Sequence, residues 1–181
     1  MAVDLFSQGA PSLAAVFEQK LVVGIGNIAV SNNPSHILST YALGSCVAVA
    51  CFDPIRGVGG LIHIMLPDSR NSGSQSNRDQ PCKYGDLGMP YLITQIQRMG
   101  ANPRQTVYFL AGGARVTDIQ VGIAIGIRNA ELARSYLKSN RLTIKGEDCG
   151  GTQNRTLHLR LSVGTLEICS PSGKKKISLK G

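Results

Sequence analysis

Residues 46–66 read CVAVACFDPIRGVGGLIHIML and decide the fold. Two short runs of apolar, often β-branched residues stand on either side of a polar segment, Asp53-Pro54-Ile55-Arg56. Pro54 suits the second position of a type I turn, because its ring already holds φ near the value that this turn requires. The stretch therefore predicts a hairpin of two buried strands.

The turn also predicts a register for the hairpin. If these four residues form the loop, Phe52 pairs with Gly57, and counting back along both strands brings Cys46 opposite His63. Opposed residues on one face of a sheet have β-carbons about 4.5–5.5 Å apart. Sequence spacing therefore predicts that the Cys46 thiol and the His63 imidazole are close enough to exchange a proton.

Further strands and two helices are expected around this hairpin. Helices are expected over about Asp86 to Met99 and over Asn129 to Ser139, with Asn129 as the N-terminal cap of the second. Apolar runs predict strands at 21–30, 37–43, 106–110, 141–148, 156–163 and 165–170. The economical arrangement is α/β, a single-domain layered sandwich with a mixed, largely antiparallel sheet.

Length and composition favour one domain. The chain has 181 residues, and 43% of them are hydrophobic, which is enough to bury one core. Residues 1–20 show weak periodicity and are expected to form an N-terminal extension, with the domain over 21–181. The polar segment 68–81 is expected to be a surface loop. No stretch approaches the roughly 20 apolar residues that span a bilayer, so no membrane insertion is expected.

Cysteine usage and charge narrow the class of protein. The five cysteines include no C-x-x-C pair, so neither disulfides nor a metal site are predicted, and the chain is expected to be cytoplasmic. The net charge of +8 is scattered, apart from Lys174 to Lys176, and only 5% of residues are aromatic. This pattern argues against nucleic-acid binding and is compatible with an acidic protein partner.

Cys46 and His63 carry the candidate chemistry. A thiol with a pKa near 8.5 is only a few per cent ionised at neutral pH, whereas an adjacent histidine can take its proton and leave an ion pair that attacks carbonyl groups. Backbone N–H groups from Gly44 and Ser45 to Cys46 are expected to stabilise the resulting oxyanion. The alternative interpretation is structural, because cysteine and histidine in apolar strands are often core residues, as we expect for Cys51.

These residues lie within a series of longer motifs. The motifs are T-x-x-L-G-S-C-V at 40–47, the Asp-Pro turn, G-G-x-x-H-x-M-L-P at 59–67, K-Y-x-D at 83–86, A-G-G-A at 111–114, I-G-x-R-N-x-E at 125–131 and E-D-x-G-G-x-x-x-R at 147–155. In them the chain resembles the chemoreceptor glutamine deamidase family, CheD, over about Leu21 to Ser170. It departs from the family pattern in the N-terminal extension, at Asp68 to Pro81, and at Arg115-Val116-Thr117.

The resemblance implies a fold, a site and a reaction. The fold would be similar to the catalytic domain of the cytotoxic necrotizing factor toxins, and the family's catalytic residues match Cys46, His63 and Thr40. Thr40 would use its hydroxyl to orient the imidazole. The implied reaction converts glutamine to glutamate, with release of ammonia, on the cytoplasmic helical bundle of methyl-accepting chemotaxis receptors. It needs no cofactor.

Two alternatives remain open at this point. The first is an adaptor that binds receptors or a CheC-type phosphatase, with hydrolase activity secondary. The second is a different cysteine hydrolase, such as a peptidase or an esterase acting on receptor methyl esters, because thioester chemistry serves amides and esters alike.

Overall fold

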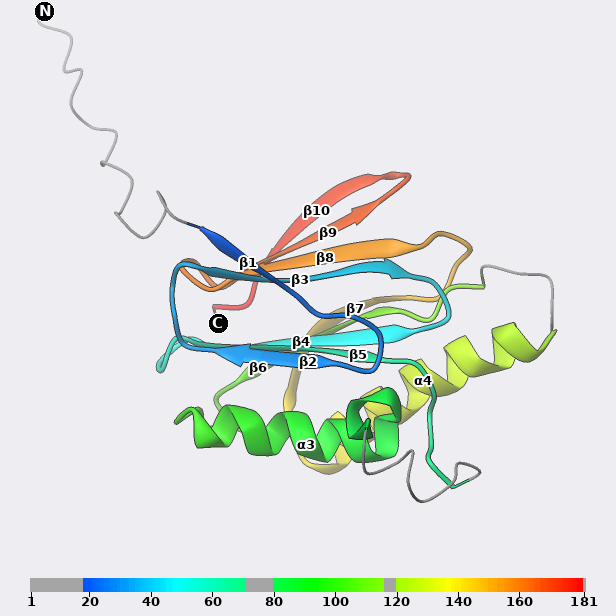
Figure 1. Cartoon of the computed structure of the whole chain (residues 1–181), viewed down its shortest axis with the longest axis horizontal. Coiled ribbons are helices and arrows are strands. Elements are labelled where there is room, and N and C mark those ends of the chain that lie inside the picture. The colour runs from blue at the N-terminus through cyan, green and yellow to red at the C-terminus, as the bar shows by residue number, and fades with distance from the viewer. Residues whose placement is uncertain (1–17, 71–79, 116–119, 181) are drawn as a thin grey trace, which may run out of the picture.

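The structure is a computed structural model that describes residues 18–70, 80–115 and 120–180, without the side chains of 120–124. The described residues form three layers, namely two β-sheets and a layer of helices on the far face of the second sheet (Figure 1). The outer sheet has the strand order β1-β3-β8-β9-β10, and the central sheet has the order β2-β5-β4-β6-β7. The elements are β1 (Gln19–Val22), β2 (Ile28–Ser31), β3 (His36–Leu43), β4 (Val47–Asp53), β5 (Val58–Ile64), η1 (Pro81–Lys83), α3 (Gly85–Arg98), β6 (Val107–Gly112), α4 (Gln120–Ser139), β7 (Thr143–Cys149), β8 (Arg155–Arg160), β9 (Thr165–Ser170) and β10 (Gly173–Ser178).

This architecture confirms the predicted α/β sandwich and divides its strands between two sheets. Both sheets are mixed and largely antiparallel, because among the described strands only β1 with β3 and β6 with β7 run parallel. Strand β1 begins at Gln19, two residues before the expected start of the domain. Residues 1–17 of the predicted extension and 71–79 of the predicted polar loop lie outside the described residues.

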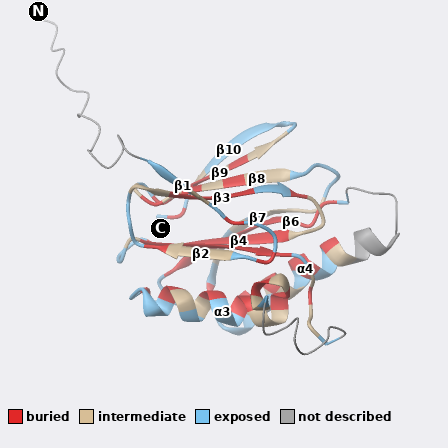
Figure 2. Ribbon diagram, viewed as in Figure 1, coloured by how far each residue is buried: buried red, intermediate tan, exposed pale blue. Residues whose placement is uncertain are grey.

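Strand β4 is buried on both faces (Figure 2). Its odd-numbered residues, Val47 to Cys51, belong to the core beneath α3 and α4. Its even-numbered residues, Ala48 to Phe52, belong to the core between the two sheets. A continuous apolar run is what a strand with two buried faces requires, and each large apolar side chain buried in it contributes about 1.5–3 kcal/mol.

The β4–β5 hairpin forms as expected, but its predicted loop is displaced by one residue. Asp53 pairs with Val58, so the loop runs from Pro54 to Gly57. Gly57 adopts a φ of 65°, and its N–H donates to the Asp53 carbonyl at 2.9 Å. Glycine takes this left-handed conformation without steric cost, which allows Asp53 to remain in the strand.

The predicted pairing of Cys46 with His63 is therefore wrong, although the predicted face is right. His63 pairs with Ala48, two residues after Cys46. Each strand has moved by one residue relative to the prediction, and two such shifts leave the same side chains on the same face. Cys46 thus lies diagonally across from His63, where neighbouring residues are about 7–8 Å apart.

The first helix agrees with the prediction to within one residue, but the predicted cap of the second helix is wrong. α4 spans Gln120–Ser139, and Asn129 lies in its interior, fully buried. Its side chain binds carbonyl groups of other segments instead of N–H groups at the start of the helix.

No helix of the described residues is long and apolar enough to cross a membrane.

The lysine cluster of the sequence belongs to β10, an edge strand of the outer sheet. Lys174, Lys175 and Lys176 are all exposed. The Nζ atom of Lys175 lies 3.4 Å from a carboxylate oxygen of Asp148, and that of Lys176 lies 3.9 Å from one of Glu167. The lysines therefore follow a sheet edge and lie close to acidic side chains.

Asp53 provides a test of the hairpin turn. Its buried carboxylate accepts the N–H groups of Ile55 (2.9 Å) and Arg56 (3.1 Å) at Oδ1 and that of Asn102 (2.8 Å) at Oδ2. We expect Asp53→Ala to lower the free energy of unfolding by about 2–4 kcal/mol, because three N–H groups lose their acceptor. Asp53→Asn keeps one oxygen, so its free energy of unfolding should lie between those of wild type and Asp53→Ala. Urea denaturation measures both, and unchanged stability of Asp53→Ala would contradict this role.

Candidate active site

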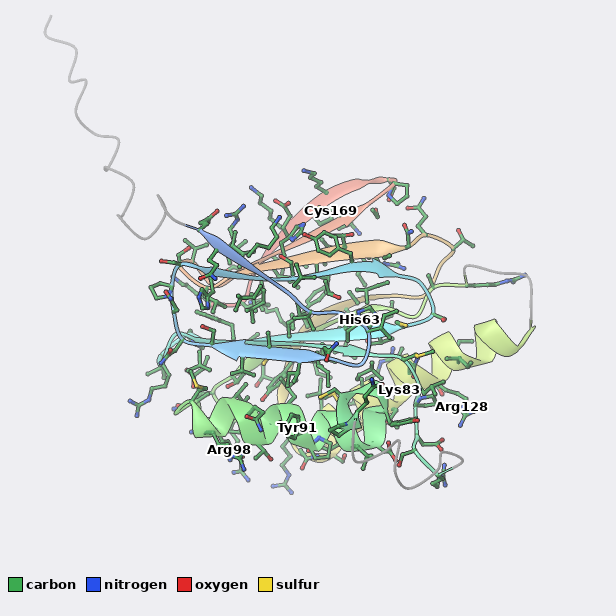
Figure 3. All side chains as sticks on the ribbon, viewed as in Figure 1. His63, Lys83, Tyr91, Arg98, Arg128 and Cys169 are labelled. Atoms are coloured by element: carbon green, nitrogen blue, oxygen red, sulfur yellow. The ribbon has the colours of Figure 1, made fainter. Side chains whose placement is uncertain are left out.

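The three predicted catalytic residues lie at one end of the space between the two sheets. Thr40 comes from β3 of the outer sheet and His63 from β5 of the central sheet, and both are buried. Cys46 belongs to the short connection through which the chain passes from β3 to β4. Figure 3 shows His63 between the sheets, towards the end where this connection lies.

Strand β3 is irregular next to this site. Its pairing with β8 shifts between Thr40 and Leu43, and Ala42 has a φ of 54°. A non-glycine residue in this left-handed region is strained, and such strain together with a bulge is common beside functional sites. The irregularity interrupts the ladder with β8, which resumes at Leu43 just before the chain crosses to the central sheet.

The Thr40 hydroxyl determines which nitrogen of His63 carries the proton. Its Oγ1 lies 2.7 Å from the carbonyl oxygen of Val23 and 2.8 Å from Nδ1 of His63. The carbonyl can only accept, so the single hydroxyl proton is donated to Val23, and Thr40 Oγ1 accepts from the Nδ1–H of His63. In the neutral ring, Nε2 is then the nitrogen with the free lone pair.

This free nitrogen is buried and has no hydrogen-bond partner among the described residues. Burial lowers the pKa of His63 to about 4, and the Val23 carbonyl acts weakly in the opposite direction. The imidazole is therefore neutral at pH 7 and can accept a proton at Nε2. A buried, unpaired acceptor is costly unless something else uses it, so Nε2 is the chemically available atom of this site.

Cys46 is partly buried and packs at the margin of the core between the sheets. Burial raises the pKa of its thiol. Because the neighbouring imidazole has a low pKa and the thiol a raised one, the resting pair is a neutral thiol and a neutral imidazole. The thiolate–imidazolium pair expected from the sequence is thus not the resting form, and no hydrogen bond joins these two side chains.

The segment Gly44 to Cys46 is held by its carbonyl groups. The Gly44 and Cys46 carbonyls accept the N–H groups of Ala114 and Gly113, both at 2.7 Å. The Ser45 carbonyl accepts from the side-chain amide of Asn129 at 3.1 Å. By contrast, the three N–H groups of the segment donate to no acceptor in the described part of the chain.

The A-G-G-A motif forms the support behind this segment. Gly112 has a φ of 115°, and a β-carbon on it would lie 2.2 Å from the carbonyl oxygen of Cys46. Any side chain at this position would push the cysteine segment away. The glycine at this position therefore allows two backbone segments to approach closely.

Asn129 is the site residue that sequence reasoning missed. It donates to the carbonyl oxygens of Ser45 (3.1 Å) and Met65 (3.0 Å), next to the cysteine and histidine segments respectively. The only signal in the sequence was its place in the I-G-x-R-N-x-E motif.

As for metals, no group of three or more His, Cys, Asp or Glu side chains in the described ranges could hold an ion.

Fold and site together define a class, an α/β sandwich with a candidate Cys–His hydrolase site at one end. A family model described as "CheD chemotactic sensory transduction" matches residues 65–170, a segment that begins just after His63. A solved structure, Bacillus licheniformis hypothetical protein YfiH, aligns with a TM-score of 0.41 and 17% identity over 67% of this chain and 49% of its own.

Curated relatives extend the match across the site. "Probable chemoreceptor glutamine deamidase CheD" of Solibacter usitatus is 37% identical over 87% of this chain and 92% of its own. "Chemoreceptor glutamine deamidase CheD" of Thermotoga maritima is 36% identical over 89% of this chain and 98% of its own. The protein belongs to the CheD family.

The low pKa of His63 predicts a pH dependence of stability. Between pH 6.5 and 4 the unfolded histidine binds a proton that the folded one does not, so stability falls as the pH drops through this window. From pH 7 to 4.5 the loss should be about 2–3 kcal/mol. We expect His63→Gln to lose this pH-dependent part of the free energy of unfolding. Urea denaturation of wild type and His63→Gln at both pH values measures it. An identical pH dependence in the two proteins would contradict the assignment.

Proposed function

We propose that this protein deamidates glutamine side chains of chemoreceptors, with Cys46 as nucleophile, His63 as general base and Thr40 as the residue that orients the imidazole. The observation that carries the proposal is the Val23–Thr40–His63 hydrogen-bond chain, which leaves the buried Nε2 unpaired on the sheet face that also bears Cys46. The names of the curated relatives supply the substrate class.

The reaction starts from the neutral pair. When the glutamine carboxamide enters, Nε2 of His63 takes the thiol proton as Cys46 Sγ attacks the carbonyl carbon. The imidazolium then gives this proton to the departing ammonia, which leaves a thioester. Nε2 next takes a proton from water, the hydroxide attacks the thioester, and the proton returns to sulfur as glutamate is released.

Thr40 acts throughout this cycle. Its hydroxyl oxygen accepts from Nδ1–H in the neutral ring and in the imidazolium, so the ring need not turn as its charge changes. Burial disfavours the imidazolium, and this makes His63 a base that readily gives its proton away. Proton return to the leaving group is the step that benefits.

The N–H groups of Gly44, Ser45 and Cys46, which have no acceptor among the described residues, support an oxyanion site. Their carbonyl groups are all engaged, those of Gly44 and Cys46 by the A-G-G-A segment and that of Ser45 by Asn129. Donors that are held in place and do not already serve an acceptor can stabilise the charge of a tetrahedral intermediate without reorganising. We assign this role to Gly44 and Ser45 together with the N–H of Cys46 itself.

Exposed apolar side chains on the segments that supply Val23, Thr40 and His63 support a protein substrate over free glutamine. Each lies within two residues of Val23, Thr40 or His63. They are Val22 (65% exposed), Ile25 (59%), Tyr41 (42%) and Met65 (39%). Exposed apolar surface around a site is typical of protein–protein contacts. The net charge of +8 would in addition steer the protein towards an acidic partner.

The proposal extends to location and to a second partner. All five cysteines are free, which fits a reducing compartment, and we propose action in the cytoplasm on the receptors' helical bundle. Following the family resemblance, we also propose that a CheC-type phosphatase binds the same exposed apolar side chains. Such binding would compete with the receptor.

The central test is incubation of purified chemoreceptor with wild-type protein, Cys46→Ala and Cys169→Ala, followed by peptide mass spectrometry. Cys169 is a matched control, because it lies on the outer sheet away from His63 (Figure 3). We expect amide-to-acid conversion with wild type and Cys169→Ala and none with Cys46→Ala.

Other results of this experiment favour the alternatives. Receptor that is bound but chemically unchanged by wild type would overturn the deamidase proposal in favour of an adaptor. Loss of methyl groups with the glutamines intact would indicate an esterase instead. Conversion by Cys46→Ala would exclude the cysteine as nucleophile.

The role of Thr40 is tested by Thr40→Val and Thr40→Ser. Valine has nearly the same shape but cannot accept from Nδ1–H, and we expect kcat to fall about 10- to 100-fold. Serine retains the hydroxyl and should stay within a few-fold of wild type. Initial rates at saturating receptor measure both variants. A fully active Thr40→Val would show that the ring needs no such partner.

A further inference from the structure

Asn129 occupies an unusual position for an asparagine. It lies in the interior of α4, and its exposed fraction is 0%. Asparagine is a poor residue for a helix interior, because its short amide competes with the backbone for hydrogen bonds. Something other than helix formation must account for it.

The side-chain amide joins the two halves of the active site. One N–H donates to the carbonyl of Ser45, the residue before Cys46, and the other to the carbonyl of Met65, two residues after His63. Both protons of the amide are used, so its orientation is determined. The cysteine segment and the end of β5 are thus held by a single rigid group.

A close approach of α4 to the end of β6 makes this reach possible. A β-carbon on Gly126 would lie 2.8 Å from the carbonyl oxygen of Gly113, the residue whose N–H binds the Cys46 carbonyl. Gly126 and Asn129 are three residues apart and so lie on the same side of the helix. Contact at Gly126 therefore brings the Asn129 amide to Ser45.

Stability alone does not account for this residue. The Oδ1 atom of Asn129 is buried and accepts no hydrogen bond from the described residues. An unpaired buried acceptor offsets much of what the two amide hydrogen bonds contribute. A residue that adds little net stability and binds both catalytic segments is better explained by the geometry that it imposes.

We infer that Asn129 is a positioning residue, which keeps the Gly44 to Cys46 segment at a set distance from His63. The inference rests on the proposed function, with Cys46 as nucleophile. It requires that loss of the two N–H donors slow the chemical step while receptor binding is preserved, because the amide binds backbone carbonyls of the catalytic segments and none of the exposed apolar side chains.

Two substitutions test this role. Asn129→Asp keeps the shape but presents oxygens, which cannot donate to the Ser45 and Met65 carbonyls. Asn129→Ala is a better helix former and also removes the unpaired oxygen, so it carries the test if the aspartate variant does not fold. We expect kcat on purified receptor to fall about 10- to 100-fold in both, with KM changed less than about 3-fold.

Alkylation of Cys46 by iodoacetamide gives a second readout. Burial raises the pKa of this thiol. If Asn129 holds the segment in place, its loss should expose the thiol, and the pH midpoint of alkylation should move down towards the ordinary value near 8.5. The thiol would then ionise more readily while catalysis becomes slower.

Thr106→Val is the matched control. Thr106 is buried, and its hydroxyl donates to the Asn102 carbonyl at 2.8 Å, so valine also removes a buried hydrogen bond. It precedes β6 at the end opposite to Gly112, roughly 20 Å from the site at about 3.3 Å per residue. We expect a lower melting temperature but unchanged kcat and unchanged alkylation of Cys46.

The outcomes separate this inference from the proposed function. Wild-type kcat and alkylation in Asn129→Asp and Asn129→Ala, with Cys46→Ala inactive, would overturn the positioning role alone. Equal losses of kcat in the Asn129 variants and Thr106→Val would also overturn it, since the effect would then follow stability. Conversion of receptor by Cys46→Ala would remove the proposed function and the inference together.

Discussion

Burial of β4 on both faces is the constraint from which the site follows. A strand that packs against helices on one side and against a second sheet on the other has no freedom to turn or slide, since either motion would exchange its two sets of core residues. Cys46, directly before this strand, and His63, on its neighbour, are therefore tied to a strand that is held by core contacts on both faces. The polar residues of the candidate site are therefore held in place by the apolar core residues of β4.

The site uses hydrogen bonds to the backbone where many hydrolases use a carboxylate. Thr40 passes its own proton to the Val23 carbonyl and so presents a pure acceptor to His63. No carboxylate in the described part of the chain stabilises the imidazolium, and burial lowers the pKa of the ring to about 4. Cys46 and His63 are thus both neutral at rest, which limits unwanted reaction of the thiol with electrophiles.

Sequence reasoning reached part of this site for a clear physical reason. The alternation of side chains along a strand depends only on parity, so the shared face of Cys46 and His63 was predictable even though the register was wrong. The register itself depended on the left-handed conformation of Gly57, and nothing in the turn sequence distinguishes that conformation from a loop of the same length that begins one residue earlier.

Other parts of the site depend on contacts between distant segments. Thr40 lies in the other sheet, so spacing along the chain could not bring it to His63, and its assignment came from the family resemblance. An asparagine ahead of an apolar helical stripe looks the same whether it caps a helix or is buried within one. For Asn129 the difference lies in the carbonyls of Ser45 and Met65, which only the fold brings to it. The pKa of His63 likewise depends on burial, a property of the assembled sheets.

Strand β10 has a consequence for how the molecule behaves among its own copies. An outermost strand offers a row of unpaired backbone groups to which a strand of another molecule can add, and such additions lead to fibrous aggregates. Lys174, Lys175 and Lys176 place positive charge along this row. Two such rows would repel each other, and an approaching strand would have to strip water from the ammonium groups. The basic cluster of β10 thus keeps the outer sheet from growing.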